Sequence, residues 1–247
     1  MRGETFPAEQ GRFPETRTSA VLSLKHADSA VRSEAYGTIV SAYWKPVYKY
    51  VRLKWNVSKE DAEDLTQGFF ARALEKQFFG SYDAAKGSFR TYLRTCLDRF
   101  VSNARASDRR IKRGGDSTAF SLDFDTAESE LLRRQPQADE SIEEYFRQEW
   151  VRSLMGLAVE ALRQNFEACG KRIHFQLFER YDLHPNDTAP ASYDQLAREL
   201  GLSATQVTNF LAAARREFRR IVLGQLREMT ASEDEFRNEA RALLGVR

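Results

Sequence analysis

The chain has 247 residues, of which 42% are hydrophobic and 30% are charged. This is the length and composition of a folded globular protein with one large or two small domains, not of a disordered chain. No run of apolar residues approaches the roughly 18 to 20 that a membrane-spanning helix needs, and the N-terminus lacks the apolar centre of a secretory signal, so we expect a cytoplasmic protein that binds no membrane.

The apolar residues recur with a helical period along the chain, and no segment has the alternation typical of strands, so we predict an all-α fold. Residues 1–17 contain prolines and glycines and few large aliphatic residues, and we expect them to form a disordered tail. A first helical domain is expected at residues 18–113. It should begin with a helix from Ser29 to Tyr43 that breaks at Trp44 and resumes as a new helix opened by Pro46.

The clearest helix of this domain follows Ser58, a suitable N-cap, because acidic residues in its first turn complement the positive end of a helix. Its buried face is expected to carry Ala62, Leu65, Phe69 and Ala73. Another helix should begin near Ser88, with an apolar face of Phe89, Leu93, Cys96 and Phe100. Cys96 and Cys169 are then buried helical residues, not partners in a disulfide.

Acidic and polar residues dominate residues 114–143, which we predict to be a flexible linker. A second helical domain is expected at residues 144–230, followed by a C-terminal helical extension at residues 231–247. In this extension Ser232 and Glu235 form a capping box and Gly245 ends the helix. The prediction is therefore two helical domains joined by a flexible acidic linker.

Charge is distributed unevenly around a net value of +2. Residues 86–113 include nine basic and two acidic residues, whereas residues 114–149 include ten acidic and three basic residues. Phe89, Tyr92 and Phe100 interleave the basic block, a combination that suits the backbone and the unstacked bases of a single-stranded nucleic acid. The alternative is a solvated helix face with the phenylalanines in the core. A further hypothesis is that the acidic linker covers the basic helix in the free protein.

Residues 192–211 have the spacing of a helix-turn-helix. Ala197 is the small residue of the helix contact, Gly201 is the turn residue, and Val207 is the buried anchor of the second helix. The second helix then exposes a set of residues whose polar members can bond base edges or phosphates: Ser203, Ala204, Thr205, Gln206, Thr208 and Asn209. Arginines further along suit phosphate contacts: Arg215, Arg216, Arg219 and Arg220. The alternative is an ordinary pair of helices with a solvated basic face.

Motifs of common catalytic and cofactor sites do not occur in the chain. It has no phosphate-binding glycine loop, dinucleotide-binding glycine turn, zinc-protease helix or nucleophile elbow. Cys169, His174 and His184 match none of the paired zinc-binding spacings. We therefore expect no enzymatic activity, no cofactor, no metal and no small-molecule substrate.

Together these features resemble the bacterial RNA polymerase sigma factors of the extracytoplasmic-function group, within the sigma-70 family. The segment DAEDLTQGFF at residues 61–70 is similar to the polymerase-binding motif of that family. Residues 89–110 are similar to its promoter-melting region, and residues 192–220 are similar to its region four. The resemblance covers residues 20–113 and 145–228. It implies core RNA polymerase and promoter DNA as partners, with an anti-sigma factor or another regulator as a third.

The resemblance implies a role for three sets of residues. Polymerase binding is implied for Asp61, Asp64, Gln67, Phe69 and Phe70, although Phe69 also suits packing. Contact with the minus-ten element is implied for Lys86, Arg90, Tyr92, Arg94, Asn103, Arg109 and Arg110. Contact with the minus-thirty-five element is implied for Ser203, Thr205, Gln206, Thr208, Asn209, Arg215 and Arg216. The chain departs from the family at Tyr92, where many relatives have tryptophan, and in the helix after Ser232, which extends past the usual end.

Two other interpretations stay open. One is a free-standing helix-turn-helix repressor or activator, whose first domain binds a ligand or forms a dimer. The other is a nucleic-acid-processing enzyme, for which the basic block offers only Asp98 and Asp108 as carboxylates. Core polymerase should copurify with a sigma factor but not with a free-standing regulator.

Overall fold

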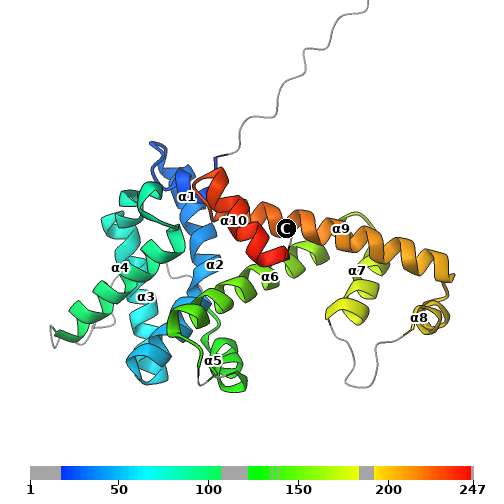
Figure 1. Cartoon of the computed structure of the whole chain (residues 1–247), viewed down its shortest axis with the longest axis horizontal. Helices are drawn as coiled ribbons and strands as arrows, with labels where there is room; N and C mark the ends of the chain where they lie inside the picture. Colours follow the sequence, from blue (N-terminus) through cyan, green and yellow to red (C-terminus); the bar gives the residue numbers. More distant parts are fainter. Residues whose placement is uncertain (1–17, 107–121, 135, 138, 184–191, 246–247) are drawn as a thin grey trace, which may run out of the picture.

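A computed structural model describes residues 18–106, 122–134, 136–137, 139–183 and 192–245. Within these residues the regular structure is helical and no strand occurs, which confirms the predicted all-α class (Figure 1). The first part of the chain forms α1 (Ala20–Ser23), α2 (Ser29–Trp55), α3 (Lys59–Lys76), η1 (Phe78–Ser81), η2 (Ala84–Lys86) and α4 (Phe89–Ala106). The remainder forms α5 (Phe124–Arg133), α6 (Ile142–Ala168), α7 (Arg172–Phe178), η3 (Glu179–Leu183), α8 (Tyr193–Leu200), α9 (Ala204–Glu228) and α10 (Glu233–Leu244). The tail expected at residues 1–17 lies outside the described residues.

Helix α2 contacts α1, α3, α5 and α6 and is continuous through Pro46, so the predicted break at Trp44 is wrong. Asp28 caps the helix by accepting a hydrogen bond from the amide of Ala30 at 2.7 Å. Proline within a helix removes one backbone donor, but burial on several sides holds the chain in place here. Val47, the residue after this proline, is 0% exposed.

The local signals predicted for α3 and α4 are present. Ser58 Oγ accepts a hydrogen bond from the amide of Asp61 at 3.1 Å, so α3 begins where expected. The apolar stripe of α3 is buried as predicted: Ala62, Leu65, Phe69 and Ala73. The buried face of α4 consists of Phe89, Leu93, Leu97 and Val101, with Cys96 and Phe100 partly exposed. Cys169 is exposed after α6, so its predicted burial is wrong.

The acidic segment contains a packed helix, α5, so the predicted flexible linker at residues 114–143 is wrong for residues 124–133. Phe124, Ala127 and Leu131 follow a spacing of three and four and are all buried. The ring centroid of Phe124 lies 5.6 Å from that of Trp44 on α2. Helix α5 is therefore part of the packed molecule, and its apolar stripe outweighs its acidic composition.

Ion pairs join the acidic face of α5 to a basic face of α2. The Glu128 carboxylate accepts hydrogen bonds from Arg52 at 2.7 and 3.1 Å, and this contact is the main cause that lowers the pKa of Glu128. Burial raises the pKa of Glu130, but hydrogen bonds from Lys45 and Lys49, each 2.7 Å long, outweigh it and the pKa is lowered overall. Both carboxyls are therefore stabilised as anions by folding.

We predict that α5 separates from α2 in acid before the core unfolds. A carboxyl whose pKa is lowered by folding stabilises the folded state above its unfolded pKa, about 4.3 for glutamate, and this contribution is lost as the pH falls through the folded pKa. Hydrogen-exchange protection of residues 124–133, corrected for the intrinsic pH dependence, should fall below about pH 4. The centre of α2 should stay protected over the same range.

The Glu128→Gln variant tests which group titrates. Its α5 amides should be less protected than those of the wild type at pH 7, and their protection should depend less on pH. The same pH dependence in the variant and the wild type would contradict the role of this carboxyl.

Helix α6 joins the two predicted domains directly. Its first half packs on α2, where the ring centroids of Trp150 and Tyr43 lie 6.0 Å apart. Its second half packs on α7 and α9 through residues that include Leu162 and Phe166. A further buried cluster joins α7 to α8 and to the start of α9. In this structure the two predicted domains are therefore packed against each other.

The C-terminal part of the chain returns to the first domain. Leu226, near the end of α9, lies in the same core as α2, α3 and α4, and Figure 1 shows α10 close to α1. The Glu228 carboxylate accepts a hydrogen bond from the Ala20 amide at 2.8 Å, and the Glu235 carboxylate accepts one from the Phe89 amide at 3.1 Å. The first amides of α1 and α4 thus have acceptors that come from the C-terminal segment.

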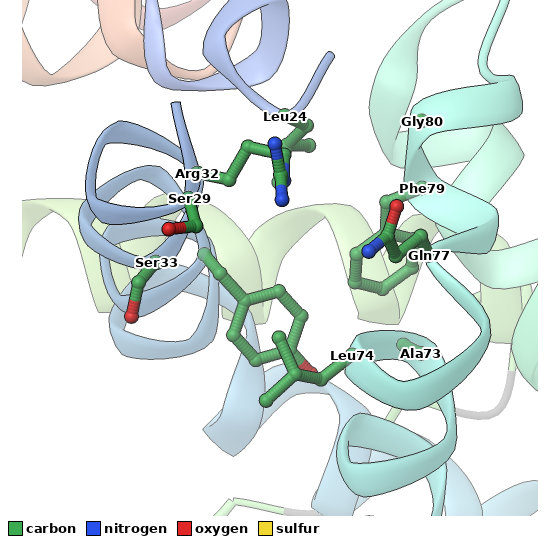
Figure 2. Close-up of a pocket in the computed structure, with 10 residues that line it drawn as sticks. Leu24, Ser29, Arg32, Ser33, Ala73, Leu74, Gln77, Phe79 and Gly80 are labelled. Atoms are coloured by element: carbon green, nitrogen blue, oxygen red, sulfur yellow. The ribbon is translucent and has the colours of Figure 1, made fainter. Parts of the chain in front are cut away.

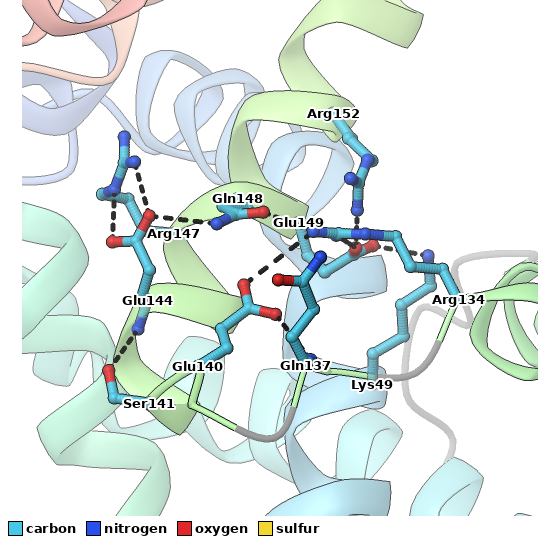
Figure 3. A network of polar contacts seen from close by, with 10 residues as sticks. All are labelled: Lys49, Arg134, Gln137, Glu140, Ser141, Glu144, Arg147, Gln148, Glu149 and Arg152. Atoms are coloured by element: carbon cyan, nitrogen blue, oxygen red, sulfur yellow. Dashed lines mark hydrogen bonds and ion pairs between the residues drawn. The ribbon is translucent and has the colours of Figure 1, made fainter.

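A buried charge cluster fixes α6 on α2 (Figure 3). The Glu149 carboxylate accepts hydrogen bonds from Lys49 at 2.6 Å, from Arg134 at 3.0 Å and from Arg152. Glu149 and Lys49 are each 3% exposed. Because removal of one member of a buried ion pair leaves the other charge uncompensated, the cluster tolerates the loss of a partner poorly.

We predict that Glu149→Ala lowers the free energy of unfolding by up to about 3 to 5 kcal/mol, because it removes the buried carboxylate shared by Lys49, Arg134 and Arg152 and leaves Lys49 with Glu130 as its remaining described partner. Urea denaturation followed by circular dichroism measures this loss. Glu160→Gln is the matched control, since Glu160 lies on the same helix and pairs with Arg163 at an exposed position. Its effect should be small, and equal losses in the two variants would contradict the role of the buried cluster.

Candidate nucleic-acid interface

Helix α4, which carries much of the basic block, has one face in the core and one face exposed. The exposed face includes Thr91, Thr95, Arg99 and Asn103. At the end of the helix, the guanidinium carbon of Arg105 lies 5.4 Å from the ring centroid of Trp55, and its Nη1 donates to the Trp55 carbonyl at 3.1 Å. Sequence reasoning counted Arg99 and Arg105 within the basic block but assigned neither a role. The pairing of a cation with an aromatic ring needs the fold to be seen, because the two residues lie far apart in the chain.

Two arginines predicted to contact DNA are covered by acidic side chains. Arg90 Nη2 lies 2.8 Å from the Glu239 carboxylate on α10, and both side chains are 16% exposed. The guanidinium carbon of Arg90 lies 4.6 Å from the ring centroid of Trp150. Arg94 donates to Glu143 at 2.5 Å. In this structure neither arginine belongs to an open basic surface.

Tyr92 is a packing residue in this structure. Its hydroxyl donates to the Phe78 carbonyl at 2.7 Å, and its ring centroid lies 5.5 Å from that of Tyr82. Burial raises the pKa of Tyr92 to about 12, so the hydroxyl is neutral and remains a donor at physiological pH. The ring is half-buried and is not presented for base stacking in this arrangement.

The other residues predicted at the minus-ten element differ in their positions. Lys86 and Asn103 are exposed, and Lys86 Nζ lies 3.6 Å from the Asp83 carboxylate. Arg109 and Arg110 lie outside the described residues. Of the described candidates, Lys86 and Asn103 are therefore the more accessible.

The acidic residues 114–149 do not cover the basic helix α4 in the way that the sequence hypothesis proposes. The carboxylates of α5 pair with basic residues of α2 and, through Asp125 and Lys59, of α3, and their described ion pairs include none with α4. Arg94 does pair with an acid of residues 114–149, namely Glu143, but Arg90 pairs with Glu239 of the C-terminal extension. The cover on α4 therefore comes from α6 and α10, at two places far apart in the sequence.

The residues predicted to bind polymerase divide between the surface and the core of α3. Asp61 and Gln67 are exposed and Asp64 is half-buried, and their spacing of three places them on one side of the helix. Phe69 and Phe70 are 0% and 2% exposed. These two phenylalanines are core residues of this structure, so in this arrangement neither is accessible for the contact implied for it.

Helices α8 and α9 meet at the tight turn expected for residues 192–211. Ser192 caps α8 by accepting a hydrogen bond from the Gln195 amide at 3.2 Å. Gly201 ends α8 with φ 65° and ψ 33°, a left-handed conformation that favours glycine. Ala197 and Val207 are 7% and 0% exposed. Both lie in the buried contact between the helices, as predicted.

The first turns of α9 present polar side chains to solvent. Ser203 and Gln206 form a reciprocal capping box: the Gln206 amide donates to Ser203 Oγ at 3.2 Å, and the Ser203 amide donates to Gln206 Oε1 at 2.8 Å. The Thr208 hydroxyl donates to the carbonyl four residues earlier at 3.0 Å. Thr205 and Asn209 are exposed. Thr205 and Asn209 are therefore the side chains best placed to bond base edges.

Arg215 holds an ion pair, in contrast to its predicted role as a phosphate contact. Its Nε and Nη2 lie 3.0 and 2.8 Å from the Asp182 carboxylate, and its guanidinium carbon lies 5.3 Å from the ring centroid of Tyr181. This contact ties α9 to η3. Arg216 and Arg219 are exposed on α9, so the open positive charge of this helix lies on them.

A small pocket lies between the start of α2 and the end of α3 (Figure 2). It holds about 180 Å³ and is lined mainly by apolar groups such as Leu24, Leu74 and Phe79. Arg32 also lines it, but its Nη1 donates to two carbonyls of the preceding loop, each at 2.7 Å. The described residues contain no cluster of three side chains able to hold a metal ion. Nor do they include a helix long and apolar enough to cross a membrane.

In comparison with known protein families, residues 39–111 match the family described as Sigma-70 region 2. The match extends from within α2 through α3 and α4, the helices that carry the exposed acidic side and the basic block. No curated protein and no solved structure matched the chain. The region 2 match supports a sigma-70 family sigma factor and a role in promoter recognition and melting.

We predict different effects on DNA binding for substitutions at Asn209 and Arg216. Asn209→Ala should change the preference at one base position by about 1 to 3 kcal/mol. Arg216→Gln should weaken binding to all sequences alike and lower the salt slope by about one. Binding of both variants to duplexes selected from a random library, measured over a salt series, distinguishes these effects. Identical effects from both substitutions would contradict the assignment of α9 as the helix that reads the base sequence.

Proposed function

We propose that the chain is a sigma factor of the extracytoplasmic-function group that binds core RNA polymerase and directs it to a restricted set of promoters. The proposal gives α3 the contact with polymerase, α4 the separated strands of the minus-ten element, and α8 with α9 the duplex at the minus-thirty-five element. Such a protein acts by binding and catalyses no reaction. It works in the cytoplasm, where an anti-sigma factor or another regulator can control it.

The region 2 match over residues 39–111 is the observation that carries this proposal. Two features of the structure are consistent with it. Asp61 and Gln67 form an exposed polar side on α3, and Thr205 and Asn209 lie exposed at the start of a long helix that follows a tight turn. The aligned exposed side of α3 suits a protein partner, and the start of α9 suits a major groove.

A sigma factor also needs to hold unstacked bases, which is energetically feasible for a basic and aromatic surface. Removing a base from the stack costs a few kcal/mol, and stacking on an aromatic ring returns about 1 to 3 kcal/mol per base. Binding by α4 can therefore offset much of the cost of opening. Contacts made by polymerase would supply the rest.

The second candidate function is a free-standing helix-turn-helix regulator. One observation favours it: the start of α9 is exposed, whereas Arg90 and Arg94 of α4 are covered. A chain in this conformation would bind duplex DNA without polymerase. The two functions differ in whether polymerase is required.

We predict that the purified chain forms a stoichiometric complex with core RNA polymerase and starts transcription from a limited set of genomic fragments. Gln67→Ala should weaken the complex about fivefold, which corresponds to about 1 kcal/mol. Glu75→Gln is the control, since Glu75 is an exposed residue at the other end of α3. Duplex binding with no complex and no transcription would contradict the sigma factor and support the free-standing regulator.

A further inference from the structure

The C-terminal helix α10 sits on the part of α4 that carries Arg90. Glu239 forms the ion pair with Arg90, and Glu235 accepts the hydrogen bond from the amide of Phe89. Apolar residues of α10, among them Phe236 and Ala240, pack against the main core. The helix is therefore attached to α4 by two carboxylates and to the core by an apolar side.

The contact beneath α10 leaves polar atoms without partners. Arg90 Nη1 and Trp150 Nε1 are both buried and, within the described part of the chain, have no hydrogen-bond partner. Buried polar groups are normally paired, and an unpaired one destabilises the contact in which it lies. The arginine and the tryptophan lie against each other, so the two unpaired groups share one place.

The chemistry of the covered residues suits a nucleic acid better than a core. An arginine beside an aromatic ring is the combination that binds the backbone and the bases of a single strand. Glu239 supplies a negative charge to the same guanidinium, as a phosphate would. Helix α10 therefore occupies Arg90 with a carboxylate at a position where a DNA strand would place its own anionic group.

The length of α9 makes the same contact incompatible with simultaneous use of both proposed DNA surfaces. Helix α9 has 25 residues, so at about 1.5 Å per residue it spans about 37 Å from its first turn to the core beside α4. Two elements about 25 base pairs apart are separated by about 85 Å of duplex. To reach both, the end of α9 and α10 must leave the first domain.

We propose that α10 is an autoinhibitory clasp that keeps the Arg90 face of α4 closed to single-stranded DNA until α10 is released. The inference rests on the proposed function, in that α4 is taken as the surface for separated strands. Release frees the guanidinium of Arg90 and removes the Glu235 acceptor from the Phe89 amide. The clasp thereby links access to α4 with the separation of α9 from the first domain.

The test compares the full-length wild type with Glu239→Gln, which keeps the size of the side chain and removes its charge. The probe is a fluorescein-labelled single-stranded DNA of 20 nucleotides with mixed sequence, and anisotropy measures its affinity at fixed low salt. The apparent affinity for the probe equals the intrinsic affinity multiplied by the fraction of molecules in which α10 is released. Because Glu239→Gln raises this fraction, the variant should bind about three- to tenfold more tightly. The double variant E239Q/R90Q should lose this gain.

Asp234→Asn is the matched control. Asp234 lies on the same helix, is exposed, and loses the same charge on substitution, so this variant should bind the probe like the wild type. Hydrogen exchange gives an independent readout: the first amides of α4, above all that of Phe89, should exchange faster in Glu239→Gln. E235Q/E239Q should enlarge both effects, and thermal denaturation verifies that each variant is folded.

Unchanged probe affinity in Glu239→Gln and E235Q/E239Q, with or without faster exchange, would overturn the clasp, because α10 then does not shield α4. An equal gain in Asp234→Asn would also overturn it, since the effect would be one of net charge. Binding to core polymerase is measured separately. A gain in single-strand affinity without any polymerase-directed transcription supports the clasp and overturns the proposed function.

Discussion

The packing of α6 on α2 determines how the remaining helices are placed. Helix α2 is buried on several sides, and Trp150 of α6 stacks on Tyr43 of α2 in a site where neither side chain reaches solvent. The buried ion pair between Glu149 of α6 and Lys49 of α2 adds a polar interaction to this apolar contact. Because α6 is a single helix that continues into the cluster with α7 and α9, this contact and the return of α9 and α10 to the first domain together set the orientation of the distal helices.

Ion pairs decide which basic residues form an accessible surface. Arg90, Arg94 and Arg215 were assigned to DNA on their residue type, yet each has a carboxylate partner in the fold. Arg99 and Arg216 have the same chemistry and are exposed. An exposed arginine attracts phosphate at long range, whereas a paired one must first lose its partner. A count of charges along the sequence therefore overestimates the positive surface of the folded chain.

Local signals could be predicted from the sequence because their physics is local. The caps at Ser58 and Ser232 and the turn at Gly201 depend on hydrogen bonds and backbone geometry within a few residues. The predicted helix break before Pro46 is wrong, because the buried surroundings of this proline keep α2 continuous although its ring removes a backbone donor. The apolar spacing of Phe124, Ala127 and Leu131 in α5 is present in the sequence, but the acidic composition around it favours the prediction of a linker. The partners of Arg90 and Arg215 depend on chain segments 149 and 33 residues away, which no spacing rule relates.

The closed arrangement has a different meaning for each candidate function. A free-standing regulator needs its duplex-reading helix exposed at all times, and the covered α4 would be ordinary core packing. A sigma factor needs two surfaces at separate DNA elements. A packed form that exposes the start of α9 and covers the Arg90 face of α4 would prevent the free protein from binding single strands without polymerase. The unpaired buried atoms of Arg90 and Trp150 are consistent with the second view, because an unpaired buried polar group weakens the contact in which it lies. Their cost lowers the free energy needed to lift α10, so the same atoms that weaken the closed state make it easier to open.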